Sequence, residues 1–259
     1  MKKLKITILT ENEVCAPLKA EHGLSMLVEY EKIRFIFDFG MSAAWKENAD
    51  FLQINISDIK YAFLSHGHND HTGGLKFFNG EFFCAPGIDK QRYSHHPGKP
   101  IRNLSMPDEC KQVLKNSKVN YIDRFTEIFP GVFCTGPIPR ITNEDCGGPF
   151  FLDDAKTIPD LISDESALLF DNGVLLHGCC HSGIINTIEL CKKYAPNIKI
   201  HTIIGGLHLL HASDERLEKT KNYLQSNNIN SLYLMHCTGQ NAISYLNAKT
   251  LTENFITMS

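Results

Sequence analysis

The segment that most constrains this chain is "FLSHGHNDHTGG", residues 63–74, which crowds four metal-capable side chains into six positions. These side chains are His66, His68, Asp70 and His71. The apolar run "IKYAFLSH" that leads into them predicts a buried strand. Because residues two apart in a strand face the same side, His66 and His68 project together, and Asp70 and His71 follow from the turn. One turn can therefore direct two ligands to one metal ion and two to a second.

The alternative is a chance cluster of polar residues. With 12 histidines in 259 residues, independent placement gives this pattern in roughly one of a thousand such sequences. Histidine and carboxylate side chains are common ligands of zinc and related ions. The segment therefore predicts a metal centre.

The bulk properties of the chain indicate an ordinary globular protein. A length of 259 residues without a linker or low-complexity segment predicts a single domain over 1–259. The net charge of -3 and a pI near 6.4 provide no basic field, so nucleic acid is not an expected partner. The N-terminal segment is too polar for a signal peptide, and no apolar run of about 18 residues predicts a membrane span. The chain has nine cysteines. Because no export signal is predicted, we expect these to be reduced thiols and the protein to be cytoplasmic.

Hydrophobic patterning predicts two sheets covered by helices. In the first half we expect a strand at 3–9, a hairpin that turns at Glu31–Lys32, a short helix at 44–53, strands at 59–66 and 81–87, and loops over 86–120. A strand at 132–136 and an irregular stretch at 136–163 follow. In the last hundred residues we expect a hairpin around Asp171–Gly173, helices at 183–194 and 213–227, strands at 198–206 and 231–236, and a short helix after Gly239.

Several motifs resemble one known family. His-x-His-x-Asp-His after an apolar strand resembles the signature of the metallo-β-lactamase-fold hydrolases. "FIFDFG" resembles the family's early strand, whose acidic end, here Asp38, supports the metal turn without binding the ion. "LYLMHCTG" resembles the last strand, which delivers a final ligand, here His236. The resemblance implies an α+β fold, a four-layer αββα sandwich, with the metal site at the strand ends that carry His66, Cys179 and His236.

A narrower resemblance comes from "GPIPR", "DESALLF", "GCCHSGIIN", "GGLHLL" and "HCTG". These segments are similar to a subfamily of pterin-ribosyl-aminobenzene phosphate synthases, which implies chemistry in the synthesis of methanopterin-type cofactors. The chain also departs from the family pattern. The usual Gly-His pair before the "SALLF" strand is absent, and Cys179, Cys180 and His181 stand where a bridging aspartate is usual. We infer that His181 supplies the missing imidazole, that Cys179 is available as a thiolate ligand, and that Cys180 packs in the core.

The expected activity is metal-assisted hydrolysis of a small, phosphorylated or ester-type substrate, in which a metal-bound hydroxide is the nucleophile. His66, His68 and His181 would hold a first ion, and Asp70, His71 and His236 a second, with Cys179 available to either. Asp70 would also orient the attacking water. Zinc is the first expectation, with iron and manganese as alternatives, because a thiolate disfavours magnesium and calcium.

Other residues are candidates for binding the substrate or supporting the ligands. His208 follows a Gly pair at a strand end, and Arg140 can grip an anion with its fork of donors. Asp164–Glu165 can orient a ligand histidine. Ser182–Gly183 open a predicted helix whose N–H groups can bind phosphate.

Three other functions remain open from the sequence. The same ligands suit an iron-containing redox protein of the same fold. A nuclease of this fold is disfavoured by the acidic pI. A binding or sensing protein with a closed, structural metal site is the third. A homo-oligomer is compatible with all of these functions.

Overall fold

The computed structural model describes residues 2–144, 146–249 and 253–258 of the chain. The chain forms two compact units. The first unit comprises Met1–Tyr121, Pro149–Asp160 and Leu251–Ser259, and the second comprises Ile122–Gly148 and Leu161–Thr250. Each unit contains one main sheet, so the two predicted sheets are present.

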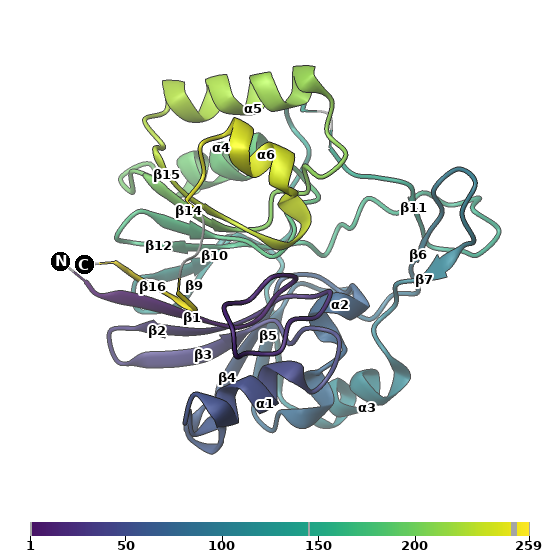
Figure 1. Cartoon of the computed structure of the whole chain (residues 1–259), viewed down its shortest axis with the longest axis vertical. Helices are drawn as coiled ribbons and strands as arrows, with labels where there is room; N and C mark the ends of the chain where they lie inside the picture. Colours follow the sequence, from purple (N-terminus) through teal and green to yellow (C-terminus); the bar gives the residue numbers. More distant parts are fainter. Residues whose placement is uncertain (1, 145, 250–252, 259) are drawn as a thin grey trace. The chain divides into compact units, whose positions relative to one another are not determined.

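The main sheet of the first unit has seven strands in the order β16-β1-β2-β3-β4-β5-β8 (Figure 1). In chain order they are β1 (Leu4–Thr10), β2 (Ser25–Tyr30), β3 (Ile33–Phe37), β4 (Tyr61–Leu64), β5 (Glu81–Cys84), β8 (Val119–Tyr121) and β16 (Phe255–Met258). The predicted hairpin is β2–β3, with Tyr30 opposite Ile33. From β3 to β8 the strands are parallel. The carboxyl ends of β3 and β4 therefore meet at one edge, which brings Asp38 beside the histidine turn.

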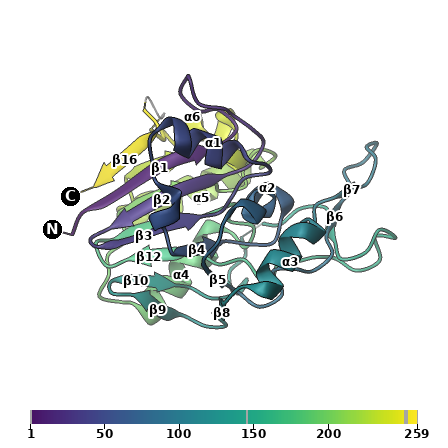
Figure 2. The ribbon, with the colours of Figure 1, turned by 90° about the horizontal axis from the view of Figure 1, so that it is seen from below.

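Helices α1 (Ala44–Phe51) and α3 (Asp108–Asn116) pack on one face of this sheet (Figure 2). Trp45 of α1 is fully buried, and its ring lies edge-on to Phe39 with centroids 5.1 Å apart. The Trp45 indole N–H also donates to the Gly74 carbonyl at 3.0 Å. Through Trp45, α1 therefore contacts both Phe39, which follows β3, and Gly74, which follows the histidine turn.

The first unit also holds a small sheet that the sequence did not predict. Its order is β11-β6-β7, formed by β6 (Tyr93–Ser94), β7 (Arg102–Asn103) and β11 (Phe150–Phe151). The expectation of loops over 86–120 is therefore wrong, because β6, β7, α3 and most of β8 lie within this stretch. A proline does not always mark a loop: Pro107 lies immediately before α3, where its missing N–H costs nothing. The short strands are below the length at which periodicity is visible.

The main sheet of the second unit has six strands in the order β15-β14-β13-β12-β10-β9. They are β9 (Thr126–Phe129), β10 (Val132–Cys134), β12 (Leu168–Phe170), β13 (Val174–Leu176), β14 (Thr202–Gly205) and β15 (Ser231–Leu234). The predicted hairpin is β12–β13, and Gly173 in its turn has φ +87°. Since β13, β14 and β15 are parallel, their carboxyl ends lead at one edge into Cys179, His208 and His236.

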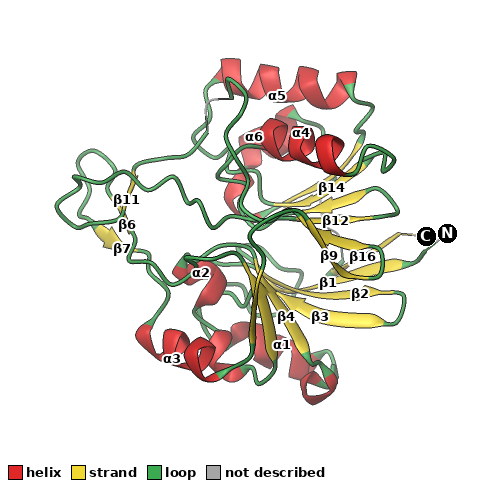
Figure 3. Cartoon of the chain, turned by 180° about the vertical axis from the view of Figure 1, so that it is seen from behind, coloured by secondary structure: helices red, strands yellow, loops and turns green. Residues whose placement is uncertain are grey.

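Three helices pack on the second sheet: α4 (Ile184–Tyr194), α5 (Asp214–Ser226) and α6 (Gln240–Tyr245) (Figure 3). The predicted helices at 183–194 and 213–227 and the short helix after Gly239 are confirmed. Their apolar residues share one core with Leu169, Leu175 and Ile203 of the sheet. Within the described ranges, we find no helix long and apolar enough to cross a membrane.

Candidate metal centre

In the first unit, the four residues of the predicted metal turn lie between β4 and the end of the short helix α2 (Asn69–Thr72). His66, His68, Asp70 and His71 are all buried, with at most 8% exposure. The His68 carbonyl accepts from the Thr72 hydroxyl at 2.9 Å, which closes the turn. The small sheet also contacts this turn: the Phe150 ring of β11 lies 5.2 Å from that of His68. The burial of so many polar side chains requires that they have polar or metal partners.

Asp38 holds this turn in place by hydrogen bonds. It is fully buried, and its carboxylate accepts from His71 Nδ1 at 2.7 Å and from the Ser65 backbone N–H at 2.8 Å. Because a carboxylate accepts, His71 carries its proton on Nδ1 and presents the lone pair on Nε2. This geometry is typical of a residue that orients a metal ligand. The effect of Asp38 on metal binding stays a prediction.

Ser65 extends the same control to His66. Its hydroxyl donates to Asp38 Oδ2 at 2.6 Å and lies 2.9 Å from His66 Nδ1. Since the hydroxyl proton points to the carboxylate, Ser65 Oγ accepts from His66 Nδ1–H, and the lone pair of His66 is on Nε2. Sequence analysis missed Ser65, although its position directly before the first histidine was the available signal.

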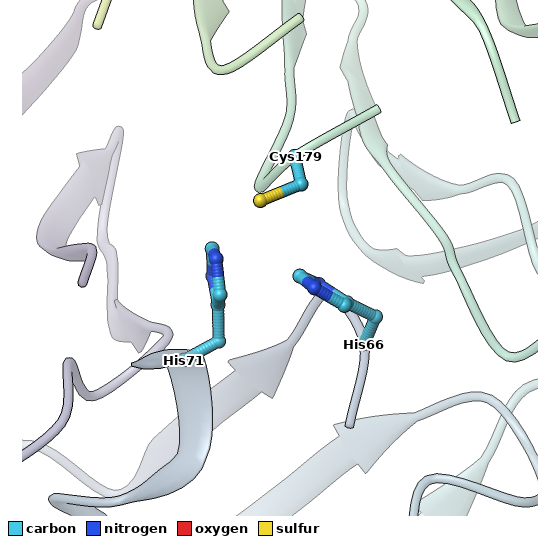
Figure 4. A group of neighbouring side chains, drawn as sticks. All are labelled: His66, His71 and Cys179. Carbon is cyan, nitrogen blue, oxygen red and sulfur yellow. The ribbon is translucent and has the colours of Figure 1, made fainter. Parts of the chain in front are cut away.

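The directions of the histidine rings fit a bound cation. His66 Nε2 lies 3.0 Å from His68 Nδ1. Two nitrogens bound to one tetrahedral zinc would be about 3.3 Å apart, so a small shift brings both into bonding range. The ring centroids of His66 and His71, drawn in Figure 4, are 4.3 Å apart. The imidazole and carboxylate donors of this turn therefore fit a divalent ion.

Asp70 has a neighbour that the sequence gave no reason to expect. Its Oδ2 lies 3.9 Å from His71 Nε2 and 3.4 Å from His22 Nε2. The His22 side chain is about half exposed, at 56%. It comes from the irregular segment between β1 and β2, where no motif marks it. His22 can therefore orient the Asp70 carboxylate from the solvent side.

In the second unit, the candidate ligands Cys179 and His236 lie close together. Cys179, also drawn in Figure 4, follows β13 and is 3% exposed, and His236 follows β15 and is 8% exposed. The potential ligand atoms of Cys179, His236 and Cys237 all lie within 4.8 Å of one another. Sequence analysis missed Cys237, although it is adjacent to a predicted ligand.

In the same unit, the ring of His181 lies against that of His208. Their ring centroids are 4.3 Å apart, and His181 is 1% exposed. The Glu165 carboxylate accepts the backbone N–H groups of His181 and of Ser182, the latter at 2.6 Å. Burial raises the pKa of Glu165 to about 7. Glu165 thus fixes the backbone of the predicted ligand rather than its ring.

Four residues at or next to the candidate ligands have unusual backbone conformations. Asp38, Cys180, His208 and His236 all have φ between +50° and +63°. Non-glycine residues rarely adopt this region, and such strain persists where surrounding structure enforces it, commonly at functional sites. Cys180 itself lies in the apolar core. His177 is buried with a pKa lowered to about 3 by desolvation, so it is a neutral core imidazole.

Two further candidates have contacts within the second unit. Arg140 donates to the carbonyls of Cys146, Leu161 and His181, at 3.1–3.4 Å. Much of its guanidinium therefore stabilises loops, and its contact with substrate stays a prediction. The expected phosphate site at Ser182–Gly183 is wrong, because the Glu144 carboxylate already accepts the N–H groups that open α4.

Comparison with known proteins agrees with this geometry. The profile of the Metallo-beta-lactamase superfamily matches residues 18–178, which include the whole histidine turn. Uncharacterized protein MJ0448 of Methanocaldococcus jannaschii is 30% identical over 249 residues, covering 93% of each chain. From the same organism, 7,8-dihydropterin-6-methyl-4-(beta-D-ribofuranosyl)-aminobenzene-5'-phosphate synthase is 29% identical over 252 residues, covering 86% of this chain and 83% of its own.

Among solved structures, Tm1679, a metal-dependent hydrolase of the beta-lactamase superfamily, superposes with a TM-score of 0.84 and 27% identity. The match covers 99% of this chain and 98% of Tm1679. A diphosphatase from the PhnP family shares the fold at a TM-score of 0.56 and 12% identity, with 100% and 98% coverage. The fold and family implied by the sequence motifs are thus confirmed, and the chain belongs to the metallo-beta-lactamase superfamily.

Proposed function

We propose that this protein is a metal-dependent hydrolase of a small ester-type or phosphorylated substrate. The observation that carries the proposal is the buried hydrogen-bond network in which Asp38 and Ser65 fix the protons of His71 and His66 on Nδ1. Neutral imidazoles with their lone pairs on Nε2 are prepared to bind a cation. A network that only stabilised the fold would not need to set two histidines in the same protonation state.

The candidate ligands are those that the sequence predicted. We propose His66, His68 and His181 for one ion, and Asp70, His71 and His236 for a second, with Cys179 available to either. A bound ion would act as a Lewis acid and lower the pKa of a water molecule towards about 7. Zinc is our first choice because imidazole and thiolate donors suit it, and iron or manganese are alternatives.

The other residues of the site would orient and protect the reactants. Asp70, with His22 on its solvent side, would hold the attacking water by its carboxylate and accept a proton from it. His208, with its ring against His181, would contact the substrate. Arg140 would bind an anionic group of the substrate through guanidinium N–H groups that do not donate to the loop carbonyls.

The relatives support this class of reaction but differ in chemistry. Tm1679 is described as a metal-dependent hydrolase, and it covers nearly the whole chain. The 29% identity to the phosphate synthase makes a synthase-type reaction on a phosphorylated substrate our second candidate. We further propose a small-molecule substrate, a cytoplasmic location and no nucleic-acid partner, with a homo-oligomer left open.

A metal-quantified preparation tests the proposal. The purified protein would be analysed for zinc, iron and manganese, and then screened against phosphoester, thioester and lactone panels. We expect at least one metal equivalent per chain. Hydrolysis should be abolished by a chelator and restored when metal is added back. A parallel preparation of His66→Ala is the control for contaminating hydrolases. Equal activity in His66→Ala, or wild-type protein that binds no divalent metal, would refute the proposal.

A further inference from the structure

We propose that Cys237 is a metal ligand, and that Cys179, His236 and Cys237 form a cation site with two thiolates. The inference rests on the proposed function, because it concerns the same metal centre. It goes further by adding a second sulfur donor to the site and by naming the class of cation, a thiophilic divalent ion. All three residues belong to the second unit.

The distances between the three ligand atoms suit one cation. They lie within 4.8 Å of one another, from segments that follow β13 and β15. In a tetrahedral zinc site, with Zn–S bonds near 2.3 Å, two sulfurs would be about 3.8 Å apart. Side-chain rotations that move the ligand atoms by up to about 1 Å would bring the two sulfurs to this spacing. No movement of a strand is required.

The backbone around Cys237 is shaped to admit its sulfur. A Cβ atom at Gly206 would lie 2.6 Å from Cys237 Sγ, so any larger residue there would displace the sulfur. The His236 backbone has φ +55°, which directs two consecutive side chains, His236 and Cys237, to the Cys179 segment.

The backbone also offers a partner for the sulfur. The His208 N–H donates to Cys237 Sγ at 3.3 Å. This N–H helps to hold the sulfur in position at the strand end. The Cys237 thiol donates to the Cys179 carbonyl at 3.5 Å, which places its sulfur against the segment that carries Cys179.

The donor set predicts which ions bind. Two thiolates and one neutral imidazole balance a divalent charge. Sulfur donors favour zinc and cadmium over manganese and magnesium, which prefer oxygen. A site with Cys179 alone would be less selective. Cys237 would therefore determine metal selectivity.

Alkylation in the presence of zinc tests the assignment without a variant. Cys237 is half-buried and accessible to reagent, as is Cys15 in the first unit. We expect zinc to protect Cys237 from iodoacetamide, as measured by peptide mass spectrometry. Cys15 is the internal control and should react at the same rate with and without zinc. Alkylation of Cys237 at an unchanged rate in the zinc-loaded protein would overturn the proposal.

Cobalt substitution counts the sulfur ligands. The intensity of the cobalt–thiolate charge-transfer band increases with the number of coordinated thiolates. We expect Cys237→Ser and Cys179→Ser each to reduce the band of the cobalt-loaded protein about twofold, and Cys15→Ser to leave it unchanged. A folded Cys237→Ser protein with the full band would show that Cys237 is not a ligand. If wild-type protein binds no cobalt or zinc, the proposed function itself fails, whereas binding without Cys237 overturns this inference alone.

Discussion

The two units assemble their candidate ligands in different ways. In the first unit, four candidate ligands come from one turn of six residues, and Asp38, which follows the neighbouring strand, holds this turn by hydrogen bonds. In the second unit, the candidates follow the ends of three parallel strands, β13, β14 and β15. The first arrangement is fixed by local hydrogen bonds. The second depends on the register of a whole sheet edge.

The comparison shows where chemical variation can be tolerated. A contiguous turn whose side chains are linked to Asp38 and Ser65 leaves little freedom for substitution. Separate strand ends can exchange one donor type for another without disturbing the rest. The unusual candidate donors are all in the second unit: Cys179, His181 and Cys237. We therefore expect the first unit to set whether metal binds, and the second to set which metal and how many ions.

The largest effect is expected for His181→Ala. If His181 replaces the missing family histidine, the variant loses at least one metal equivalent and its activity falls at least about 100-fold, the upper range for residues that only support ligands. Metal content and hydrolysis are measured on the same preparation.

His208→Ala is the matched control, since its ring lies against that of His181. It should keep its metal and lose substrate affinity. Full metal occupancy in His181→Ala would show that His181 is not the third imidazole of the ion assigned to His66 and His68.

A second prediction compares two adjacent cysteines. Cys179→Ser should change metal preference or stoichiometry, because it replaces a soft donor by a hard one. Cys180→Ala should have little effect on metal content, because Cys180 lies in the apolar core. Competition between zinc and manganese, followed by elemental analysis, gives the preference. Loss of metal in Cys180→Ala but not in Cys179→Ser would reverse the assignment of this turn.

A third prediction separates support from ligation in the first unit. Asp38→Asn should weaken metal affinity about 10- to 100-fold without abolishing binding, because the amide no longer fixes the His71 ring as a carboxylate does. Ser65→Ala should cost less, since it removes the contact to His66 and leaves that to His71. Zinc titration with a chromophoric chelator measures both. A larger effect of Ser65→Ala than of Asp38→Asn would contradict this order.

Sequence reasoning recovered the parts of the fold that depend on local patterns. The hairpins β2–β3 and β12–β13 and helices α4 and α5 follow from alternation, helical period and turn residues. The small sheet was missed because strands of two residues carry no period. At the candidate site, contiguous ligands were visible as a motif. Ser65, His22 and Cys237 were not, because their roles arise from proximity in space, and a serine, a loop histidine and a cysteine are each common without function.

The smallest predicted effect concerns Glu144, which separates stability from metal chemistry. Its carboxylate accepts three N–H groups at the start of α4, which lowers its pKa, while burial raises the pKa by more. A carboxyl whose pKa is raised on folding binds its proton more tightly in the folded state. The stability of the wild type should therefore fall relative to Glu144→Gln as pH rises from 4.5 through the raised pKa. The expected difference is about 1 kcal/mol, the scale of one helix-terminal charge. Urea unfolding of both proteins in chelator, at pH 4.5 and pH 8, measures it free of metal binding. If the wild type instead gains stability relative to Glu144→Gln as pH rises, the N–H groups outweigh burial. The start of α4 would then be stabilised by a charged cap, and the segment that carries His181 would depend on pH in the opposite sense.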